Sequence, residues 1–167
     1  MTQTEEQRRG RRSRAKGKAF EEMLDRTFAY YSSKGFALID KTPEPMKPIR
    51  SMGQGRFLAC YTKAAQPDYK GTIKGGRTVM FEAKYTEHDR ILQDAVNDCQ
   101  TAYMLSAEAL GARCYVVVGF STGGVYRIPF GVWCNMKRIY GHKYVTEEEI
   151  KQYQVSTSWN DVLLILD

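Results

Sequence analysis

The stretch Gln66-Pro67-Asp68-Tyr69-Lys70-Gly71, read together with Phe81-Glu82-Ala83-Lys84, decides how this chain folds. Between the two segments lies Gly75-Gly76, a turn signal that sends the chain back on itself. Residues 78–84 contain good strand formers and follow the two glycines, which predicts a strand. The sequence therefore predicts a β-hairpin whose arms carry the two quoted segments.

The predicted hairpin gathers acidic and basic side chains on one face. Because side chains alternate between the faces of a strand, Glu82 and Lys84 point the same way, roughly 6–7 Å apart along it. The returning chain brings Asp68 near that face. Two carboxylates and one ammonium group are thus expected to converge at one place.

Two carboxylates beside a lysine suit metal-assisted hydrolysis of a phosphodiester. Mg²⁺ keeps several waters and needs only one or two protein carboxylates, which Asp68 and Glu82 provide. The metal polarises the phosphate and lowers the pKa of a bound water, and Lys84 is suited to orient or deprotonate that water. The alternative is an exposed hairpin with a solvated Glu–Lys pair, because short acidic-basic patterns recur by chance.

Length and composition limit the classes of protein. A chain of 167 residues with 43% apolar residues fits one domain with a substantial core. No apolar run approaches the roughly eighteen residues that cross a membrane, and no apolar stretch follows the N-terminal arginines as it would in a secretory signal. The four cysteines lack C-x-x-C spacing, so neither a zinc site nor a disulfide framework is expected, and a cytoplasmic location fits.

The N-terminal segment carries most of the positive charge. Residues 1–18 hold seven Lys and Arg residues against two Glu, in a chain of net charge +6. Low hydrophobicity and like charges predict a disordered basic arm over residues 1–15, ahead of one domain over residues 16–167. Such an arm would either neutralise DNA phosphates or serve only solubility. The candidate phosphate-binding residues are Arg11, Arg12, Arg14, Lys16 and Lys18.

Helices and strands are expected to alternate along the rest of the chain. Apolar residues at helical spacing predict a helix over residues 18–34, ended by Gly35, and a strand over 36–40. A longer helix is predicted over 91–110, with an inward face made of Ile91, Leu92, Ala95, Cys99, Ala102 and Leu105. The later elements are a buried strand over 113–120, a hairpin through Gly123-Gly124 to 125–128, and a short helix after Pro129 with Trp133 in the core. A capping box at 146–149 begins a further short helix, and residues 162–166 form a strand or a tail docked on the body.

Residues 41–61 interrupt this pattern. Pro43, Pro45 and Pro48 break regular structure, and only residues 57–61 at the far end indicate a strand. Cations and apolar side chains alternate through the segment. A loop of this length inside a compact domain is usually either functional or mobile.

Several of these segments carry a resemblance to known nucleases. Pro67-Asp68 followed by Glu82-Ala83-Lys84 resembles the Pro-Asp…(Asp/Glu)-x-Lys motif of the restriction-endonuclease-like nucleases. The chain from residue 16 onward also resembles the RecU-type Holliday junction resolvases. The segments that occur in the order of that family are 16–21, 41–45, 68–71, 81–84, the region of Gln100, and 141–146. The likeness is specific in order and loose in identity, which indicates a divergent phage or Gram-positive bacterial member.

The resemblance implies a fold, an activity and partners. The fold would be a restriction-endonuclease-like α/β core, a mixed β-sheet flanked by helices, with residues 41–61 as a projecting stalk. The activity would be Mg²⁺-dependent resolution of four-way DNA junctions, with Mn²⁺ as a possible substitute, and two symmetric cuts call for a homodimer. Asp68, Glu82 and the Ala83 carbonyl would bind the metal, while Lys84 serves the water. Recombination or branch-migration proteins are possible further partners.

Two more residues gain a role near the metal through the resemblance. Glu21 is otherwise a carboxylate that favours the dipole of a helix N-terminus, and Gln100 is otherwise a surface residue of a helix. In the family, residues at these positions lie at the active site. The sequence departs from the family where Gln66 and Pro67 replace threonines before the aspartate and where Cys99 replaces the histidine before Gln100.

The resemblance also assigns DNA contacts outside the hydrolytic site. The stalk would enter the open centre of a junction, where cations meet phosphates and Phe57 or Met52 contacts unstacked bases; otherwise it is a surface loop or a dimer arm. The stalk candidates are Lys47, Arg50, Arg56 and Phe57. Lys143 belongs to a second cluster of cations and aromatics over residues 137–144, either a phosphate contact or a solvated loop.

Two alternatives to junction resolution remain at this point. One is a nuclease of the same fold that cuts duplex or flap DNA. The other is a non-catalytic DNA-binding protein, which would have no need of paired carboxylates facing phosphate.

Overall fold

The computed structural model describes residues 3–43, 46–61, 66–158 and 161–166. Its helices are α1 (Gln3–Ser33), α2 (Asp98–Ala109), α3 (Phe130–Cys134) and α4 (Met136–Tyr140). Its strands are β1 (Ala37–Lys41), β2 (Met46–Gly53), β3 (Arg56–Tyr61), β4 (Tyr69–Ile73), β5 (Arg77–Thr86), β6 (Arg90–Leu92), β7 (Arg113–Phe120), β8 (Val125–Pro129) and β9 (Tyr144–Thr146). Five strands form the central sheet in the order β1-β4-β5-β7-β8, with β5 and β7 parallel and the other neighbours antiparallel.

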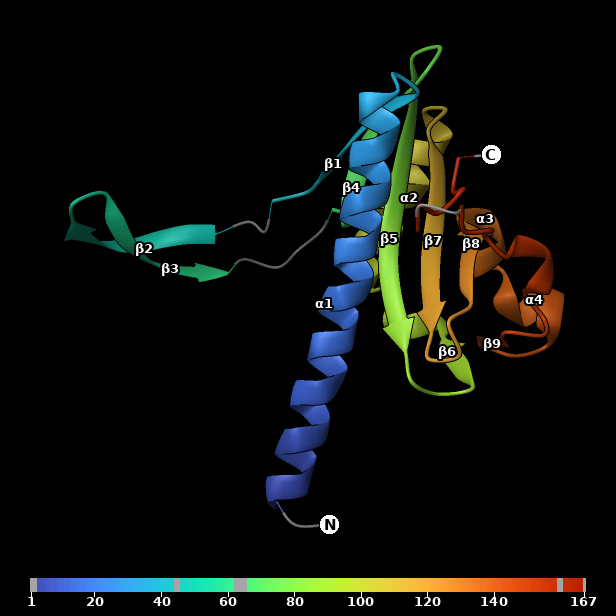
Figure 1. The fold of residues 1–167 in the computed structure, drawn as a ribbon, viewed down its shortest axis with the longest axis horizontal. Coiled ribbons are helices and arrows are strands. Elements are labelled where there is room, and N and C mark those ends of the chain that lie inside the picture. The colour runs from blue at the N-terminus through green and yellow to red at the C-terminus, as the bar shows by residue number, and fades with distance from the viewer. Residues whose placement is uncertain (1–2, 44–45, 62–65, 159–160, 167) are drawn as a thin grey trace.

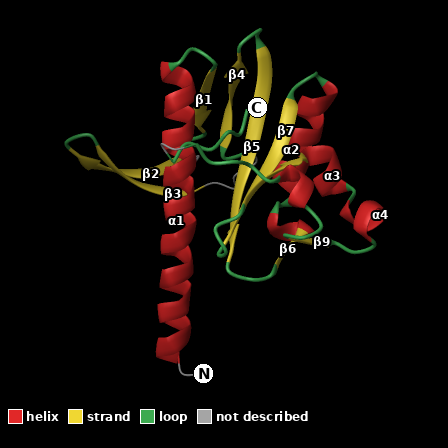
Figure 2. Cartoon of the chain, turned by 45° about the vertical axis from the view of Figure 1, so that its right-hand side comes forward, coloured by secondary structure: helices red, strands yellow, loops and turns green. Residues whose placement is uncertain are grey.

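Helices cover both faces of this sheet. Figure 1 and Figure 2 show α1 along one face and α2 with α3 on the other. Strand β7 explains the arrangement, because its side chains alternate between two apolar clusters. Val117 packs in the cluster of Leu24 from α1, whereas Val116 packs in the cluster of Met104 and Trp133 from α2 and α3. The predicted α/β class, with a mixed sheet flanked by helices, is confirmed.

Helix α1 begins much earlier than the sequence predicts. The expected disordered arm over residues 1–15 is wrong for residues 3–15, which form one continuous helix with the predicted segment. Glutamine, glutamate, arginine and lysine cost little free energy in a helix. The helix can extend through them without a new nucleation step, because its other half is already packed against the sheet. That half buries Phe20, Leu24 and Phe28 against the sheet. The helix ends at Ser33, just before Gly35, the predicted stop, where φ is +68°.

The predicted irregular segment before residue 57 is instead part of a hairpin. Strands β2 and β3 pair with each other in a separate two-stranded sheet, and every described side chain in β2 is exposed. Pro48 does not break β2, because the pairing register shifts between Pro48 and Arg50, where a bulge tolerates a missing amide hydrogen. Pro45 lies outside the described residues. Figure 1 shows this hairpin projecting from the side of the central sheet, as the expected stalk does.

The chain returns from the hairpin to the point where it left the sheet. Lys41, the last residue of β1, is the Cα partner of Tyr69, the first residue of β4. The backbone N–H of Thr42 donates to the carbonyl of Asp68 at 2.7 Å. The hairpin is therefore an insertion between two paired strands and is closed at its base.

The helix predicted over residues 91–110 is too long at its start. Residues 90–92 form β6, which pairs with β9, and helix α2 begins only at Asp98 after Asn97 as its N-cap. The predicted inward face is correspondingly wrong at Leu92 and Leu105, which are 51% and 46% exposed, and at Ala102, which is also exposed, whereas Met104 is fully buried. Residues 90–92 are a strand because they pair with β9, which lies far along the chain. This pairing buries Ile91, which the sequence analysis places on a helix.

The C-terminal elements agree with the sequence in their contacts more than in their shape. The capping box is present, with Thr146 N–H donating to Glu149 Oε2 at 2.9 Å, but a turn and a short 3₁₀ helix (Lys151–Tyr153) follow it. Leu163 is buried, and its N–H donates to Thr27 of α1 at 3.2 Å, so the tail docks on the body as predicted. Among the described residues, no helix is both long and apolar enough to cross a membrane.

Candidate active site

The hairpin of β4 and β5 positions the acidic residues. Tyr69 is the Cα partner of Phe81, so Asp68, one residue before β4, lies beside Glu82 and Ala83. Gly71 permits the close approach of β1 to β4, since a Cβ at this position would lie 2.0 Å from the carbonyl oxygen of Leu38. The predicted convergence follows from the strand pairing.

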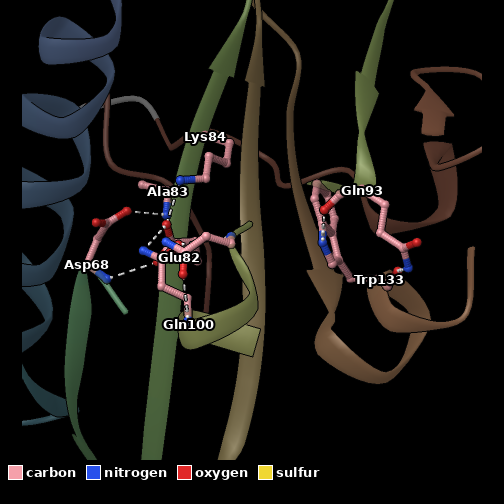
Figure 3. A network of polar contacts seen from close by, with 8 residues as sticks. Asp68, Glu82, Ala83, Lys84, Gln93, Gln100 and Trp133 are labelled. Carbon is pink, nitrogen blue, oxygen red and sulfur yellow. Dashed lines mark hydrogen bonds and ion pairs between the residues drawn. The ribbon is translucent and has the colours of Figure 1, made fainter. Parts of the chain in front are cut away.

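A hydrogen-bond network joins these residues (Figure 3). The Ala83 N–H donates to Asp68 Oδ2 at 2.9 Å, and the Asp68 N–H donates to Glu82 Oε2 at 3.3 Å. Lys84 Nζ donates to Glu82 Oε1 at 2.6 Å, and Gln100 Nε2 donates to the same oxygen at 2.8 Å. The structure thus brings Asp68, Glu82, Lys84 and Gln100 together, as the sequence analysis predicts.

Burial raises the pKa values of both carboxyl groups. Burial raises the pKa of Glu82 to about 7, with a further contribution from the charge of Asp68, although Lys84 opposes the shift. Burial is also the main cause of the raised pKa of Asp68, to which Glu21 adds. Two buried carboxyl groups whose charged forms are disfavoured are a donor set that a divalent cation stabilises.

The donor set fits a hard cation with few protein ligands. Within the described part of the chain, no group of three or more His, Cys, Asp or Glu side chains is arranged to hold a metal ion. Mg²⁺ needs only one or two carboxylates and completes its shell with water. Asp68 and Glu82 are therefore the residues that would hold it. The assignment of the Ala83 carbonyl as a third ligand remains a prediction, since the contact seen is from its N–H.

Glu21 lies in the electrostatic neighbourhood of Asp68 but has its own partner. Lys41 Nζ contacts Glu21 Oε2 at 2.6 Å. The charge of Glu21 raises the pKa of Asp68, and the charge of Asp68 in turn adds to the raised pKa of Lys41. Tyr69 ties this part of α1 to the sheet, with its hydroxyl donating to Asp25 Oδ1 at 2.6 Å. Lys41 is a site residue that the sequence analysis missed, and its position at the end of the first strand is the signal that could have indicated it.

Asn97 is the second residue that sequence reasoning missed. It caps α2 and holds Gln100 through a reciprocal capping box, and Gln100 is only 6% exposed beside Glu82. The Asn-x-x-Gln spacing before an apolar run is a capping-box signal, but the helix start predicted at residue 91 concealed it.

The N-terminal candidates for DNA contact lie along α1. Arg11, Arg12, Arg14 and Lys18 are exposed, whereas Lys16 is half-buried and forms an ion pair with Glu87. The exposed residues are available to a phosphate, while Lys16 anchors the helix to the loop after β5.

The pairing of β2 with β3 determines which side chains of the projecting hairpin share a face. Residues opposite each other in an antiparallel pair share a face, and alternate residues of one strand share a face. Lys47 faces Cys60, Arg50 faces Leu58, and Gly53 faces Arg56. The three cations Lys47, Arg50 and Arg56 therefore lie on one face of the hairpin. Phe57, which is 61% exposed, lies on the other face opposite Ser51.

Lys143 lies apart from these groups, between α4 and β9, and its side chain is exposed. Its neighbours are engaged within the molecule. The ring of His142 stacks on Tyr144 with centroids 3.7 Å apart, and His142 Nε2 lies 3.0 Å from Glu149 Oε1. Within the predicted second cluster of residues 137–144, Lys143 is thus exposed to solvent, whereas the rings of His142 and Tyr144 stack on each other.

Replacing Glu82 with Gln is expected to stabilise the metal-free protein. The pKa of Glu82 is about 7 in the folded state and close to its ordinary 4.5 when unfolded, so its ionisation costs nothing below about pH 4.5 and the full amount above about pH 7. The melting temperature of Glu82→Gln in chelator should therefore exceed that of the wild type at about pH 8, by roughly 2–4 °C per kcal/mol relieved, and match it at about pH 4. A lower melting temperature at pH 8 would contradict the burial argument.

Comparisons with known proteins match nearly the whole chain. The profile of the RecU family (Recombination protein U) matches residues 15–165. The Holliday junction resolvase RecU of Pediococcus pentosaceus is 31% identical over 112 residues, which are 63% of this chain and 55% of that protein. The RecU of Geobacillus kaustophilus is 27% identical over 148 residues, 83% of this chain and 74% of that protein. The chain thus spans little more than half of the first relative.

A solved structure supports the fold independently. Hjc, a Holliday junction resolvase from the archaeon Archaeoglobus fulgidus, superposes with a TM-score of 0.50 at 15% identity. The match covers 81% of this chain and 92% of the other. At this identity the likeness concerns the fold alone.

Proposed function

The chain belongs to the RecU family, and from that premise we propose that it is a structure-selective endonuclease that resolves four-way DNA junctions by Mg²⁺-dependent hydrolysis. The observation that carries the proposal is the convergence of Asp68, Glu82 and Lys84 at the open end of one hairpin. A protein that only binds DNA gains nothing from two buried carboxyl groups with raised pKa values beside a phosphate.

The residues divide the hydrolytic work among them. Asp68 and Glu82 would hold Mg²⁺, which supplies polarisation of the phosphate and a more acidic water. Lys84 is 24% exposed and held on Glu82 Oε1, so its ammonium group can orient the attacking water and offset negative charge on phosphorus. Gln100 donates to the same oxygen of Glu82 and limits rotation of that carboxylate.

We assign DNA binding to basic surfaces that recognise the shape of the DNA rather than its base sequence. The cationic face of the hairpin and the exposed cations of α1 supply phosphate contacts, which position DNA without reading its sequence. Phe57 is available to contact an unstacked base at the centre of a junction. Two symmetric cuts require two copies of the site, so we propose a homodimer with twofold symmetry. We propose that the protein acts in the cytoplasm of a bacterial cell, either uninfected or infected by a phage. We also propose recombination or branch-migration proteins as its partners.

The test is cleavage of a synthetic mobile four-way junction. With Mg²⁺ the protein should cut two opposing strands symmetrically, while Ca²⁺ should support binding without cutting. Equal binding and cutting of junction and linear duplex would replace the proposal with a nuclease of the same fold that acts on duplex or flap DNA. Binding without any cutting in Mg²⁺ or Mn²⁺ would leave a DNA-binding protein.

Deleting residues 1–15 is expected to weaken junction binding and flatten its dependence on salt. The deletion removes exposed arginines of α1 but leaves Phe20, Leu24 and the rest of the packed helix in place. For each phosphate that the shortened protein no longer neutralises, the slope of log affinity against log salt should fall by about 0.9. Fluorescence anisotropy titrations between about 50 and 200 mM salt measure this slope, because affinity changes strongly over that range. An unchanged slope would show that this part of α1 does not touch phosphate.

A further inference from the structure

We infer that Asn97 is a positioning residue that orients the side-chain amide of Gln100 and, through it, the carboxylate of Glu82. The inference rests on the proposed function, because Glu82 is there the metal ligand. Asn97 is joined to Gln100 by hydrogen bonds and reaches the carboxylate of Glu82 through that residue.

Three hydrogen bonds join Asn97 and Gln100. Asn97 Nδ2 donates to Gln100 Oε1 at 2.7 Å, and the backbone N–H of Asn97 donates to the same oxygen at 3.3 Å. In return the backbone N–H of Gln100 donates to Asn97 Oδ1 at 3.0 Å. The side-chain oxygen of Gln100 therefore receives two donors from one residue.

These donors decide which end of the amide faces the carboxylate. A glutamine side chain carries one acceptor oxygen and one NH₂ donor. Because Oε1 is held by Asn97, the NH₂ group of Gln100 must face Glu82, and it donates to Glu82 Oε1 at 2.8 Å. Gln100 is 6% exposed and Glu82 is fully buried, so water cannot satisfy either group if the amide turns over.

The orientation of Gln100 fixes the orientation of Glu82. Glu82 Oε1 accepts from both Gln100 and Lys84, while Glu82 Oε2 is the oxygen that contacts the N–H of Asp68. The amide thus keeps one oxygen of Glu82 occupied and the other turned toward Asp68. A reversed amide would place its own oxygen against a carboxylate oxygen and push Glu82 out of this arrangement.

The segment that carries Asn97 is itself held in place. The side-chain amide of Gln93 donates to the carbonyls of Trp133 and Cys134 at 2.7 and 2.9 Å, and Trp133 Nε1 donates to the Gln93 carbonyl at 3.1 Å (Figure 3). These bonds fasten the chain just before α2 to α3. Asn97 therefore presents its amide from a fixed position.

Capping a helix does not by itself require an asparagine. An N-cap needs an oxygen that accepts from the first turn, and aspartate serves as well as asparagine. Only the NH₂ group of Asn97 distinguishes the two residues toward Gln100 Oε1. The substitution Asn97→Asp therefore keeps the cap and favours the reversed amide, since a carboxylate at this position attracts the NH₂ group of Gln100.

The first test measures Mg²⁺ binding and cleavage of Asn97→Asp. Partners outside the ligand shell typically change metal affinity or activity 10–100-fold, so we expect about tenfold weaker Mg²⁺ binding by calorimetry and a matching rise in the Mg²⁺ concentration that gives half-maximal cleavage. Asn135→Asp is the matched control, because Asn135 is an exposed N-cap like Asn97, but its side chain donates to the Gly131 carbonyl and does not cap its helix, far along the chain from Glu82. Wild-type Mg²⁺ affinity in Asn97→Asp, with cleavage intact in the wild type, would overturn the inference.

The second test is a double-mutant cycle with Gln100→Ala, read by melting temperature in chelator. If Asn97 acts through Gln100, the loss of melting temperature caused by Asn97→Asp should disappear once Gln100 is absent. Additive losses would overturn the inference. This cycle needs no metal and no substrate, so it decides the role of Asn97 even where the wild type neither binds Mg²⁺ nor cuts a junction, an outcome that would overturn the proposed function instead.

Discussion

Asp68→Asn is expected to lower the rate of junction cleavage by about 1000-fold or more while leaving junction affinity nearly unchanged. Loss of one of two carboxylates removes several kcal/mol of metal-dependent stabilisation of the transition state, and each 1.4 kcal/mol corresponds to roughly a factor of ten. Affinity should persist because the cationic side chains of α1 and the projecting hairpin lie elsewhere in the molecule. Single-turnover cleavage and anisotropy with a labelled junction separate the two quantities.

The matched control for this substitution is Asp40→Asn. Asp40 is exposed on β1, and the same chemical change there removes one charge without touching the network of Glu82. The control should cut at the wild-type rate. Cleavage by Asp68→Asn at the rate of the control would end the assignment of Asp68 to the metal and with it the hydrolytic proposal.

The triple substitution of Lys47, Arg50 and Arg56 by Gln is expected to remove most of the preference for a junction over linear duplex. The three cations lie on one face of a hairpin whose two strands, over their described residues, pair with each other and not with the central sheet, so they can act together on one stretch of DNA backbone. If each meets a phosphate, the slope of log affinity against log salt should fall by about 2–3. Parallel titrations of junction and duplex measure both effects.

A triple variant of equal charge controls for net charge. Lys74, Arg77 and Arg113 are exposed and lie at the opposite end of the paired strands, near the turn between β4 and β5. Their replacement by Gln should change junction and duplex binding alike and only slightly. An equal loss of selectivity in both variants would mean that bulk charge, rather than the hairpin, governs recognition.

Local rules are enough to predict the acidic centre of this protein. Strand alternation places Glu82 and Lys84 on one side, and a double-glycine turn returns the chain to Asp68, so neighbouring residues determine the geometry. The same reasoning predicts β7 from its run of valines and the core position of Trp133. Each of these depends on contacts between segments that are close in sequence or on burial alone.

The errors arise where distant segments decide the outcome. Strand β6 exists because it pairs with β9, which lies far along the chain, and that pairing moves the start of α2 to Asp98. With the helix start misplaced, the role of Asn97 as a cap could not be recognised. The N-terminal helix is a different case. Its like charges predict disorder, but the helix that packs against the sheet extends through these residues, because they cost little free energy in a helix.

The closure between Thr42 and Asp68 has a consequence for how such an enzyme can diversify. Strands β2 and β3 lie between these residues along the chain, while the ends of β1 and β4 pair directly with each other. Under the proposed function, DNA recognition by the hairpin of β2 and β3 and hydrolysis at Asp68 belong to parts of the chain that adjoin at this closure. We therefore expect that the arm can be lengthened or exchanged while Asp68 keeps its position beside Glu82.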